Sequence, residues 1–208
     1  LLLYSINVVA DDSQELAKLL VEYKTIQGDF EQSLLDSKGE IIQESSGIFT
    51  VKSPGYFLWD TKVPFPQLLV SNLQDIWLYD PDLEQVTIRP YSQDIDQSPA
   101  LLLSGNIEKI SQTYHIKKNS NVYKDNNNRS DKLVNITSYF VLTPKQVNSV
   151  FIELQLGFID NTIQQMTLAD SLGQTTHFTF SNMVLNQIIN EEIFEFSIPV
   201  GVDVLIDK

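Results

Sequence analysis

The sequence predicts a mainly β protein, an antiparallel meander that is closed or half closed, with an amphipathic helix at its start. Three observations lead to this fold class. Residues 12–23 carry apolar side chains at helical spacing, apolar and polar residues alternate through most of the chain after residue 28, and short turn signals separate the alternating runs. Strands joined by short turns pair with their chain neighbours, and a series of them builds a meander.

The first predicted element is a helix of about a dozen residues. Asp12 can cap its start, with Glu15 at the capping-box position. Leu16, Leu19 and Leu20 follow on one stripe, so we expect an amphipathic helix that buries this stripe.

Residues 1–10, before this helix, are largely apolar and uncharged. They end in Val8-Val9-Ala10 and are followed by two aspartates. This pattern is typical of the end of a secretory signal peptide with its small-residue cleavage site. An ordinary first strand fits the same residues equally well.

A series of alternating runs follows the helix, and each is predicted to be a strand. In the run 148–157, the even-numbered residues from Val150 to Leu156 are predicted on one face, and in the run 175–185 Phe178 and Phe180 share a face. The predicted strands are 28–35, 41–52, 56–62, 67–71, 75–80, 84–90, 114–118, 139–143, 148–157, 162–169, 175–185 and 193–197.

Two segments interrupt the meander. Ser98 and Pro99 supply an N-cap and a first-turn proline for a short apolar helix that ends before Gly105. Residues 119–131 are rich in Asn, Asp, Ser and Lys and are predicted to be a solvated loop. Because no repeat or inter-domain linker is visible, we expect residues 11–208 to form a single domain.

Composition excludes several classes of function. The chain has 208 residues, a formal net charge of −13 and no cysteine, and its only histidines are His115 and His177. The negative charge repels phosphate backbones, so no nucleic-acid partner is expected. Without thiols, and with two imidazoles, thiolate chemistry and multi-histidine metal sites are excluded. Asp80, Asp82 and Glu84 lack the glycine and terminal glutamate of a calcium loop, so we predict no metal, and no cofactor.

Residues 47–91 form a central block with three distinctive pieces, which are Gly47–Trp59, Leu69–Ser71 and Ile76–Val86. Other pieces along the chain are Phe30–Gln32, Ser98–Leu102, Phe140–Lys145 and Phe194–Val204. In their order and spacing these pieces resemble the LolA family, the periplasmic carriers of outer-membrane lipoproteins, and the resemblance covers essentially all of 11–208.

The resemblance implies a strongly curved, incompletely closed antiparallel β-barrel with a lid of short α-helices over an apolar cavity. It implies a monomeric carrier, not an enzyme, in the periplasm of a Gram-negative bacterium. Such a carrier takes triacylated lipoproteins from an inner-membrane ABC transporter and delivers them to an outer-membrane acceptor lipoprotein. It also favours the signal-peptide interpretation of residues 1–10. The alternative is a lipid-binding or lipoprotein-sensing module of the same half-barrel fold.

The resemblance also suggests which residues bind the acyl chains. Taken singly, an aromatic residue on a strand is far more often plain core than ligand-binding. With the resemblance, the candidates for the cavity wall and lid are Phe30, Phe49, Val51, Phe57, Trp59, Leu69, Trp77, Leu78, Tyr79, Leu101, Leu102 and Leu103.

The chain departs from the family at two places. Family members usually carry an arginine before the proline of the central block, where it holds the lid closed, and this position is Ser53 here. A serine lacks the charged, five-donor guanidinium, so we expect a lid held less firmly unless Lys52 or Arg89 substitutes. At Asn72-Leu73, where a hairpin turn is expected, we predict a turn without positive φ at the leucine.

Overall fold

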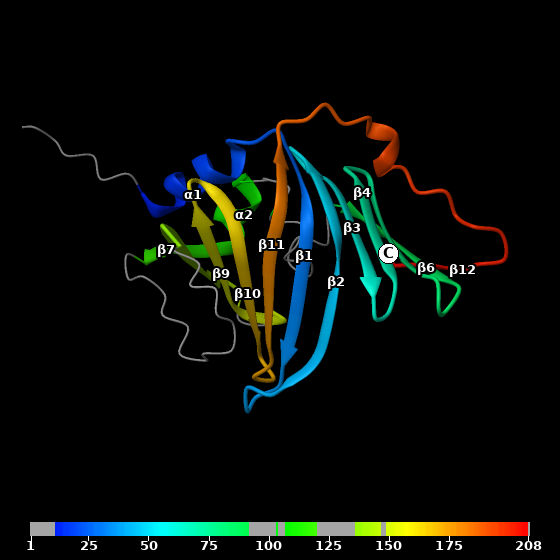
Figure 1. Cartoon of the computed structure of the whole chain (residues 1–208), viewed down its shortest axis with the longest axis horizontal. Helices are drawn as coiled ribbons and strands as arrows, with labels where there is room; N and C mark the ends of the chain where they lie inside the picture. The colour runs from blue at the N-terminus through cyan, green and yellow to red at the C-terminus, as the bar shows by residue number, and fades with distance from the viewer. Residues whose placement is uncertain (1–10, 92–102, 104–106, 120–135, 147–148, 208) are drawn as a thin grey trace, which may run out of the picture.

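The computed structural model describes residues 11–91, 103, 107–119, 136–146 and 149–207. They contain a single sheet of 12 strands in the order β12-β6-β5-β4-β3-β2-β1-β11-β10-β9-β8-β7. The pairs are antiparallel except β12 and β6, which are parallel. The sheet curves strongly, and its two end strands do not pair with each other (Figure 1). The prediction of a mainly β, incompletely closed fold is confirmed.

Most predicted strands lie within a few residues of their observed bounds. None of the described helices is long and apolar enough to cross a membrane. The elements in chain order are α1 (Asp12–Val21), β1 (Thr25–Leu35), β2 (Ile41–Lys52), β3 (Tyr56–Val63), β4 (Gln67–Asn72), β5 (Asp75–Asp80), β6 (Gln85–Pro90), α2 (Ile107–Thr113), β7 (Tyr114–Asn119), β8 (Ser138–Pro144), β9 (Phe151–Ile159), β10 (Thr162–Asp170), β11 (Thr175–Leu185), the 3-10 helix η3 (Glu191–Phe194) and β12 (Asp203–Ile206).

The larger apolar core lies on the face of the sheet that α1 and α2 cover, which we call the inner face. Both helices lie beside β7, at one side of the curved sheet (Figure 1). Leu16, Leu19 and Leu20 of α1 and Ile110 of α2 pack there against side chains from β1–β3, β5 and β7–β11. The core therefore joins strands from both halves of the chain.

A smaller core lies on the opposite, outer face of strands β3–β6. Val70, Trp77 and Val86 are buried there beneath Phe194 of η3. Because both faces of these strands are covered, β4 and β5 carry nearly continuous apolar runs instead of an alternation.

The start of α1 differs from the prediction by one residue. The N-cap is Asp11, whose carboxylate accepts hydrogen bonds from the backbone N–H and the hydroxyl of Ser13. These hydrogen bonds, the one from the hydroxyl first, lower the pKa of Asp11. Asp12 and Glu15, predicted as cap and capping box, instead bind Lys118 of β7, through its backbone N–H and its ammonium respectively.

Near the end of the chain, one predicted strand does not form and one observed strand was not predicted. A helix in the middle of the chain was also missed. Residues 193–197 are not a strand, since η3 occupies 191–194 and Phe194 is its buried anchor. The true last strand, β12, was not predicted, because a run as short as Val204–Ile206 carries too little alternation to count. Helix α2 was also missed, since Ile107–Thr113 is short and has only one apolar pair at helical spacing.

The predicted face of β9 holds only in part. Leu154 and Leu156 are buried, but Val150 and Ile152 are 57% and 53% exposed. A register shift at Ala169/Asp170 of β10 changes the pairing there, and Phe151 packs against the inner core instead.

The β4–β5 turn also corrects a prediction. Leu73 has a φ of 74°, in the left-handed region that a leucine rarely adopts. The Asn72 carboxamide oxygen accepts from the backbone N–H groups of Gln74 and Asp75, both at 3.0 Å, which fixes the turn. The Leu73 side chain packs against the inner core, so burial offsets the strained backbone.

Gly47 on β2 should tolerate no larger residue. A Cβ at this position would lie 2.0 Å from the Asp60 carbonyl oxygen and 2.9 Å from the Phe30 ring. We expect Gly47→Ala to lower the free energy of unfolding by about 3 kcal/mol, because backbone must move. In the control Gly39→Ala, where φ is 81° and nothing lies within 4 Å, only the backbone cost of about 1 kcal/mol applies. Urea unfolding measures both, and equal losses would contradict the clash.

Candidate functional site

The inner wall is centred on Trp59 of β3. Its ring stacks on Phe30 with centroids 3.9 Å apart, and on Phe57 at 5.9 Å, and Phe49 lies 5.8 Å away. These residues and Val51 are at most 7% exposed. The structure therefore brings five predicted wall residues together from three adjacent strands.

Strand register continues this wall towards the open edge of the sheet. Phe49 pairs with Trp59, Trp59 with Leu69, and Leu69 with Leu78. Directly paired residues share a face, so Leu69 and Leu78 extend the same row. Both are half-buried, and Leu69 packs against the inner core.

Trp77 and Tyr79 do not belong to this wall. Both take part in the outer core, where Tyr79 lies 5.5 Å from Phe196 between ring centroids. The physical reason is alternation, because three consecutive strand residues cannot point to one face. The prediction that placed them in the cavity wall with Leu78 is therefore corrected.

The inner wall has a second half that the sequence did not identify. Phe178 and Phe180 of β11 meet Trp59 edge-on, at 5.5 and 6.3 Å between centroids, because β11 pairs with β1. Their shared face was predicted from alternation, but no local pattern shows which distant strand they adjoin. Further buried residues of this half are Phe140, Leu142, Leu154, Leu156, Phe158, Ile163, Met166 and Leu168.

The predicted lid is described in one residue of three. Leu103 is 3% exposed and belongs to the inner core. Leu101 and Leu102 lie outside the described residues. So do residues 1–10, the predicted end of a signal peptide, and residues 120–131 of the predicted loop. Within the described chain, the helices that pack on the inner face are α1, which was predicted to bury its leucine stripe, and α2, which was not predicted.

The position of the missing arginine lies in the β2–β3 turn. The Ser53 backbone N–H donates to the Lys24 carbonyl oxygen at 2.9 Å, which ties this turn to the segment between α1 and β1. Lys52 pairs with Glu191 of η3. Arg89 is paired in register with Ile76 of the inner core, and its Nε lies 3.2 Å from an Asp207 carboxylate oxygen. Of the two substitutes considered, Arg89 is the one on the inner face.

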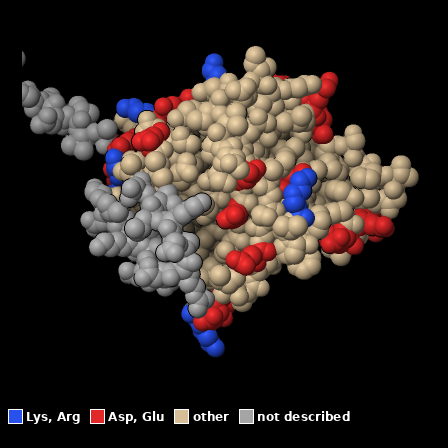
Figure 2. Space-filling view, viewed as in Figure 1, with Lys and Arg blue, Asp and Glu red and all other residues tan. Residues whose placement is uncertain are grey.

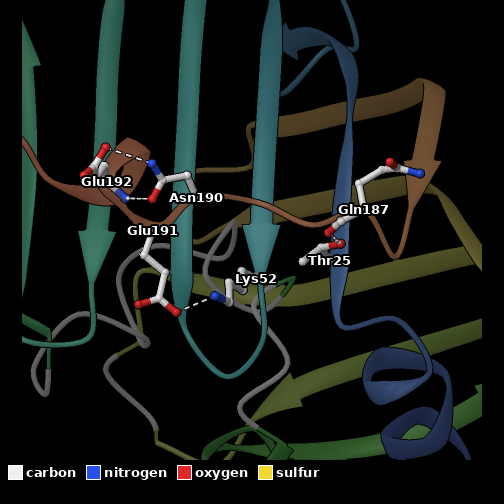
Figure 3. A network of polar contacts seen from close by, with 6 residues as sticks. All are labelled: Thr25, Lys52, Gln187, Asn190, Glu191 and Glu192. Carbon is white, nitrogen blue, oxygen red and sulfur yellow. Dashed lines mark hydrogen bonds and ion pairs between the residues drawn. The ribbon is translucent and has the colours of Figure 1, made fainter.

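Residues 186–202, which we call the C-terminal strap, lead from β11 across the outer face (Figure 1). Figure 3 shows its polar anchors: the Lys52–Glu191 ion pair, and the hydrogen bond from the Thr25 hydroxyl to the Gln187 carbonyl oxygen at 2.8 Å. The Asn190 side chain accepts from the Glu192 backbone N–H and so caps η3. These contacts set Phe194, which is fully buried, over the outer core.

Beyond its apolar rows the inner face is hollowed by an open groove of about 510 Å³. On the face that Figure 2 shows, acidic side chains lie scattered among uncharged ones, in keeping with the net charge of −13. The groove is lined by Gln32, Gln43, Ser45, Thr61, Phe65, Gln67, Asp80, Asp82 and Leu83.

An open, curved sheet with an aromatic inner wall under short helices defines a binding protein with an apolar interior. Comparison with known proteins makes this specific. The family described as "Outer membrane lipoprotein carrier protein LolA" matches residues 22–197. The chain belongs to the LolA family, whose members are carriers and not enzymes.

Relatives and solved structures agree. The chain is 41% identical over 199 residues to the outer-membrane lipoprotein carrier protein of Pseudomonas aeruginosa, covering 94% of this chain and 89% of that protein. It is 40% identical over 190 residues to that of Hahella chejuensis, covering 91% and 86%. A LolA superfamily protein from Nitrosomonas europaea shares the fold, with a TM-score of 0.50 and 11% identity over 89% of this chain and 96% of that one. So does an uncharacterized conserved protein from Thermus thermophilus, with a TM-score of 0.56 and 9% identity over 94% and 98%.

Phe194 should be the main anchor of the strap. Truncation to alanine leaves a cavity in the outer core, and we expect Phe194→Ala to lower the free energy of unfolding by about 3 kcal/mol. Its neighbour Ile193 is 39% exposed, so Ile193→Ala should cost no more than about 0.5 kcal/mol. Chemical denaturation compares the two variants. Similar small losses from both would show that the strap is not held by Phe194.

Proposed function

We propose that this chain carries triacylated lipoproteins through the periplasm of a Gram-negative bacterium. It takes them from an inner-membrane ABC transporter and delivers them to an outer-membrane acceptor lipoprotein. The observation that supports this most is the buried aromatic wall around Trp59, in a chain about 40% identical to proteins named as lipoprotein carriers.

The physical task is to shield acyl chains from water. Each buried methylene contributes about 0.8 kcal/mol, so a long acyl chain cannot remain in water unaided. The inner wall offers large apolar side chains from β1–β5 and from β8–β11, which suits chains of variable conformation. Acyl chains would take the place of the helices' leucines against this wall.

Binding would be reversible because the acyl chains of the lipoprotein replace the helix side chains that cover the inner wall. The stripe of Leu16, Leu19 and Leu20 buries apolar area against the wall, and cargo methylenes would bury the same area in its place. The gain from cargo is thereby partly offset by the loss of helix packing. The chain carries no Walker-type phosphate loop, so energy for loading would come from the transporter.

The polar contacts that hold α1 are few. Lys118 of β7 donates its backbone N–H to Asp12 at 2.9 Å and pairs with Glu15, and both members of that ion pair are partly exposed. Exposed pairs of this kind contribute about 0–1 kcal/mol. With Ser53 in place of the family arginine, we infer that the cover is held mainly by apolar packing and therefore opens readily.

The two tryptophans provide a direct test of where acyl chains bind. Trp59 lies on the inner face and Trp77 on the outer, and the chain contains only these two. In a Trp77→Phe variant, a fatty acid brominated along its chain should quench the emission of Trp59 strongly. In the matched Trp59→Phe variant, quenching of Trp77 should be weak. Equal quenching of both would place the acyl chains elsewhere.

Carrier activity is tested by release of lipoproteins from spheroplasts. Newly made lipoproteins should enter the soluble fraction when the chain is added and stay on the membrane without it. Leu69→Glu puts a charge on the inner wall and should abolish release, whereas Ile48→Glu, at a 43% exposed position on the outer face of β2, should largely preserve it. Release that is independent of the chain, or equally sensitive to both changes, would contradict the proposal.

A further inference from the structure

The inner face changes from apolar to polar within two residues along each of four strands. Two residues span about 7 Å of strand and keep the same face. On each strand the apolar member belongs to the predicted acyl-binding wall and the polar member to the groove. The pairs are Phe30 and Gln32 on β1, Trp59 and Thr61 on β3, Leu69 and Gln67 on β4, and Leu78 and Asp80 on β5.

These polar residues line one continuous surface. Gln32 pairs with Ser45, and Thr61 with Gln67, so the polar positions adjoin across strands as the apolar ones do. At the rim, Phe65 and Leu83 are 62% and 68% exposed. We call the polar lining the polar belt, and it consists of Gln32, Gln43, Ser45, Thr61, Gln67, Asp80 and Asp82.

The chemistry of the belt suits a peptide. Carboxamides and hydroxyls both donate and accept, as the N–H and C=O groups of an extended chain require. Of its two carboxylates, that of Asp80 accepts from the Gln67 amide at 3.1 Å and from the Leu83 backbone N–H at 3.0 Å. That of Asp82 is exposed.

The belt does not suit an anionic phosphate. Among the described residues that line the groove there is no Lys or Arg, the side chains that best bind phosphodiester oxygens. Lys62 is close in sequence, but alternation puts it on the outer face, where it pairs with Asp60. The two carboxylates repel a phosphodiester at short range.

We propose that the polar belt binds the uncharged polypeptide that directly follows the acylated residue of the cargo, and that it disfavours lipids with anionic phosphate headgroups. The inference rests on the proposed function, since it needs acyl chains against the inner wall. With the chains there, the junction between lipid and peptide falls at the boundary between the two surfaces. The belt then distinguishes lipoprotein from phospholipid, which the apolar wall cannot do.

The test compares two probes that carry the same acyl chains. One is an N-acetylated cysteine that carries two acyl chains on a glyceryl group and is followed by an uncharged, amidated Ser/Asn peptide, and the other is phosphatidylglycerol with the same two chains, both dispersed in the same detergent. Each displaces a fluorescent fatty acid from the full-length chain. We expect the lipopeptide to displace the fatty acid at about a tenfold lower concentration than phosphatidylglycerol does. A tenfold ratio of affinities corresponds to about one hydrogen bond to a charged group.

Two charge-reversal variants distinguish the effect of the polar belt on binding from the effect of net charge. Asp82→Lys puts a cation in the groove and should improve the binding of phosphatidylglycerol. The preference for lipopeptide should therefore fall by about threefold, which corresponds to the free energy of one exposed ion pair. Glu44→Lys makes the same change of net charge on the outer face of β2, beside Ser45, and should leave the preference unchanged. Gln32→Leu should weaken lipopeptide binding without affecting the fatty acid.

Equal changes of preference in Asp82→Lys and Glu44→Lys would overturn the inference, because overall charge alone would then explain the selectivity. No change in any of the three variants would overturn it as well. Failure of the proposed function looks different, since the wild-type chain would then bind neither the fatty acid nor the lipopeptide.

Discussion

The stacking of aromatic rings around Trp59 is the contact on which the rest of the structure depends. It joins β1, β2 and β3 through Phe30, Phe49 and Phe57, and it reaches β11 through two further phenylalanines. Gly47 leaves space for the Phe30 ring at the middle of this cluster. Because β1 and β11 are neighbours in the sheet but distant in sequence, the cluster holds the two halves of the barrel together. Helix α1 belongs to the same core but lies beside β7 and α2.

The two faces of the sheet differ in how the segments that cover them are attached. The outer face is fastened by the strap, through Phe194, the cap of η3 and the Lys52–Glu191 pair. On the inner face, among the described residues, Lys118 makes polar contacts with α1 and Lys145 with the end of α2. Under the proposed function this asymmetry is what a carrier needs, since the wall keeps its curvature while the cover moves. The grading of the same face from apolar rows to the polar belt would let one surface receive both parts of an amphiphilic cargo.

The meander, the amphipathic helix and most strand positions could be predicted from the sequence, because period-two alternation and turn residues are local signals. Phe30, Phe49, Phe57 and Trp59, which family resemblance suggested as wall residues, lie together in the inner core. Trp77 and Tyr79 were misplaced because β5 is covered on both faces, so its composition does not show which side chains point inward. The phenylalanines of β11 and the short β12 depend on pairing between distant segments, which no local pattern records. Leu73 was mispredicted because tertiary packing stabilises a backbone conformation that its residue type disfavours.

The pairing of β1 with β11 has a consequence for how the chain folds. Hairpins such as β2–β3 and β9–β10 join neighbours in sequence and can form early, whereas Ile26 meets Leu185 only when most of the chain is present. High contact order of this kind slows folding, because the entropy of closing a long loop is lost before the contact is gained. A chain that is still being synthesised therefore cannot pair β1 with β11 until β11, which begins at Thr175, has been made. Under the proposed function the chain is exported, and this delay would keep the polypeptide from closing its sheet while it is still being synthesised.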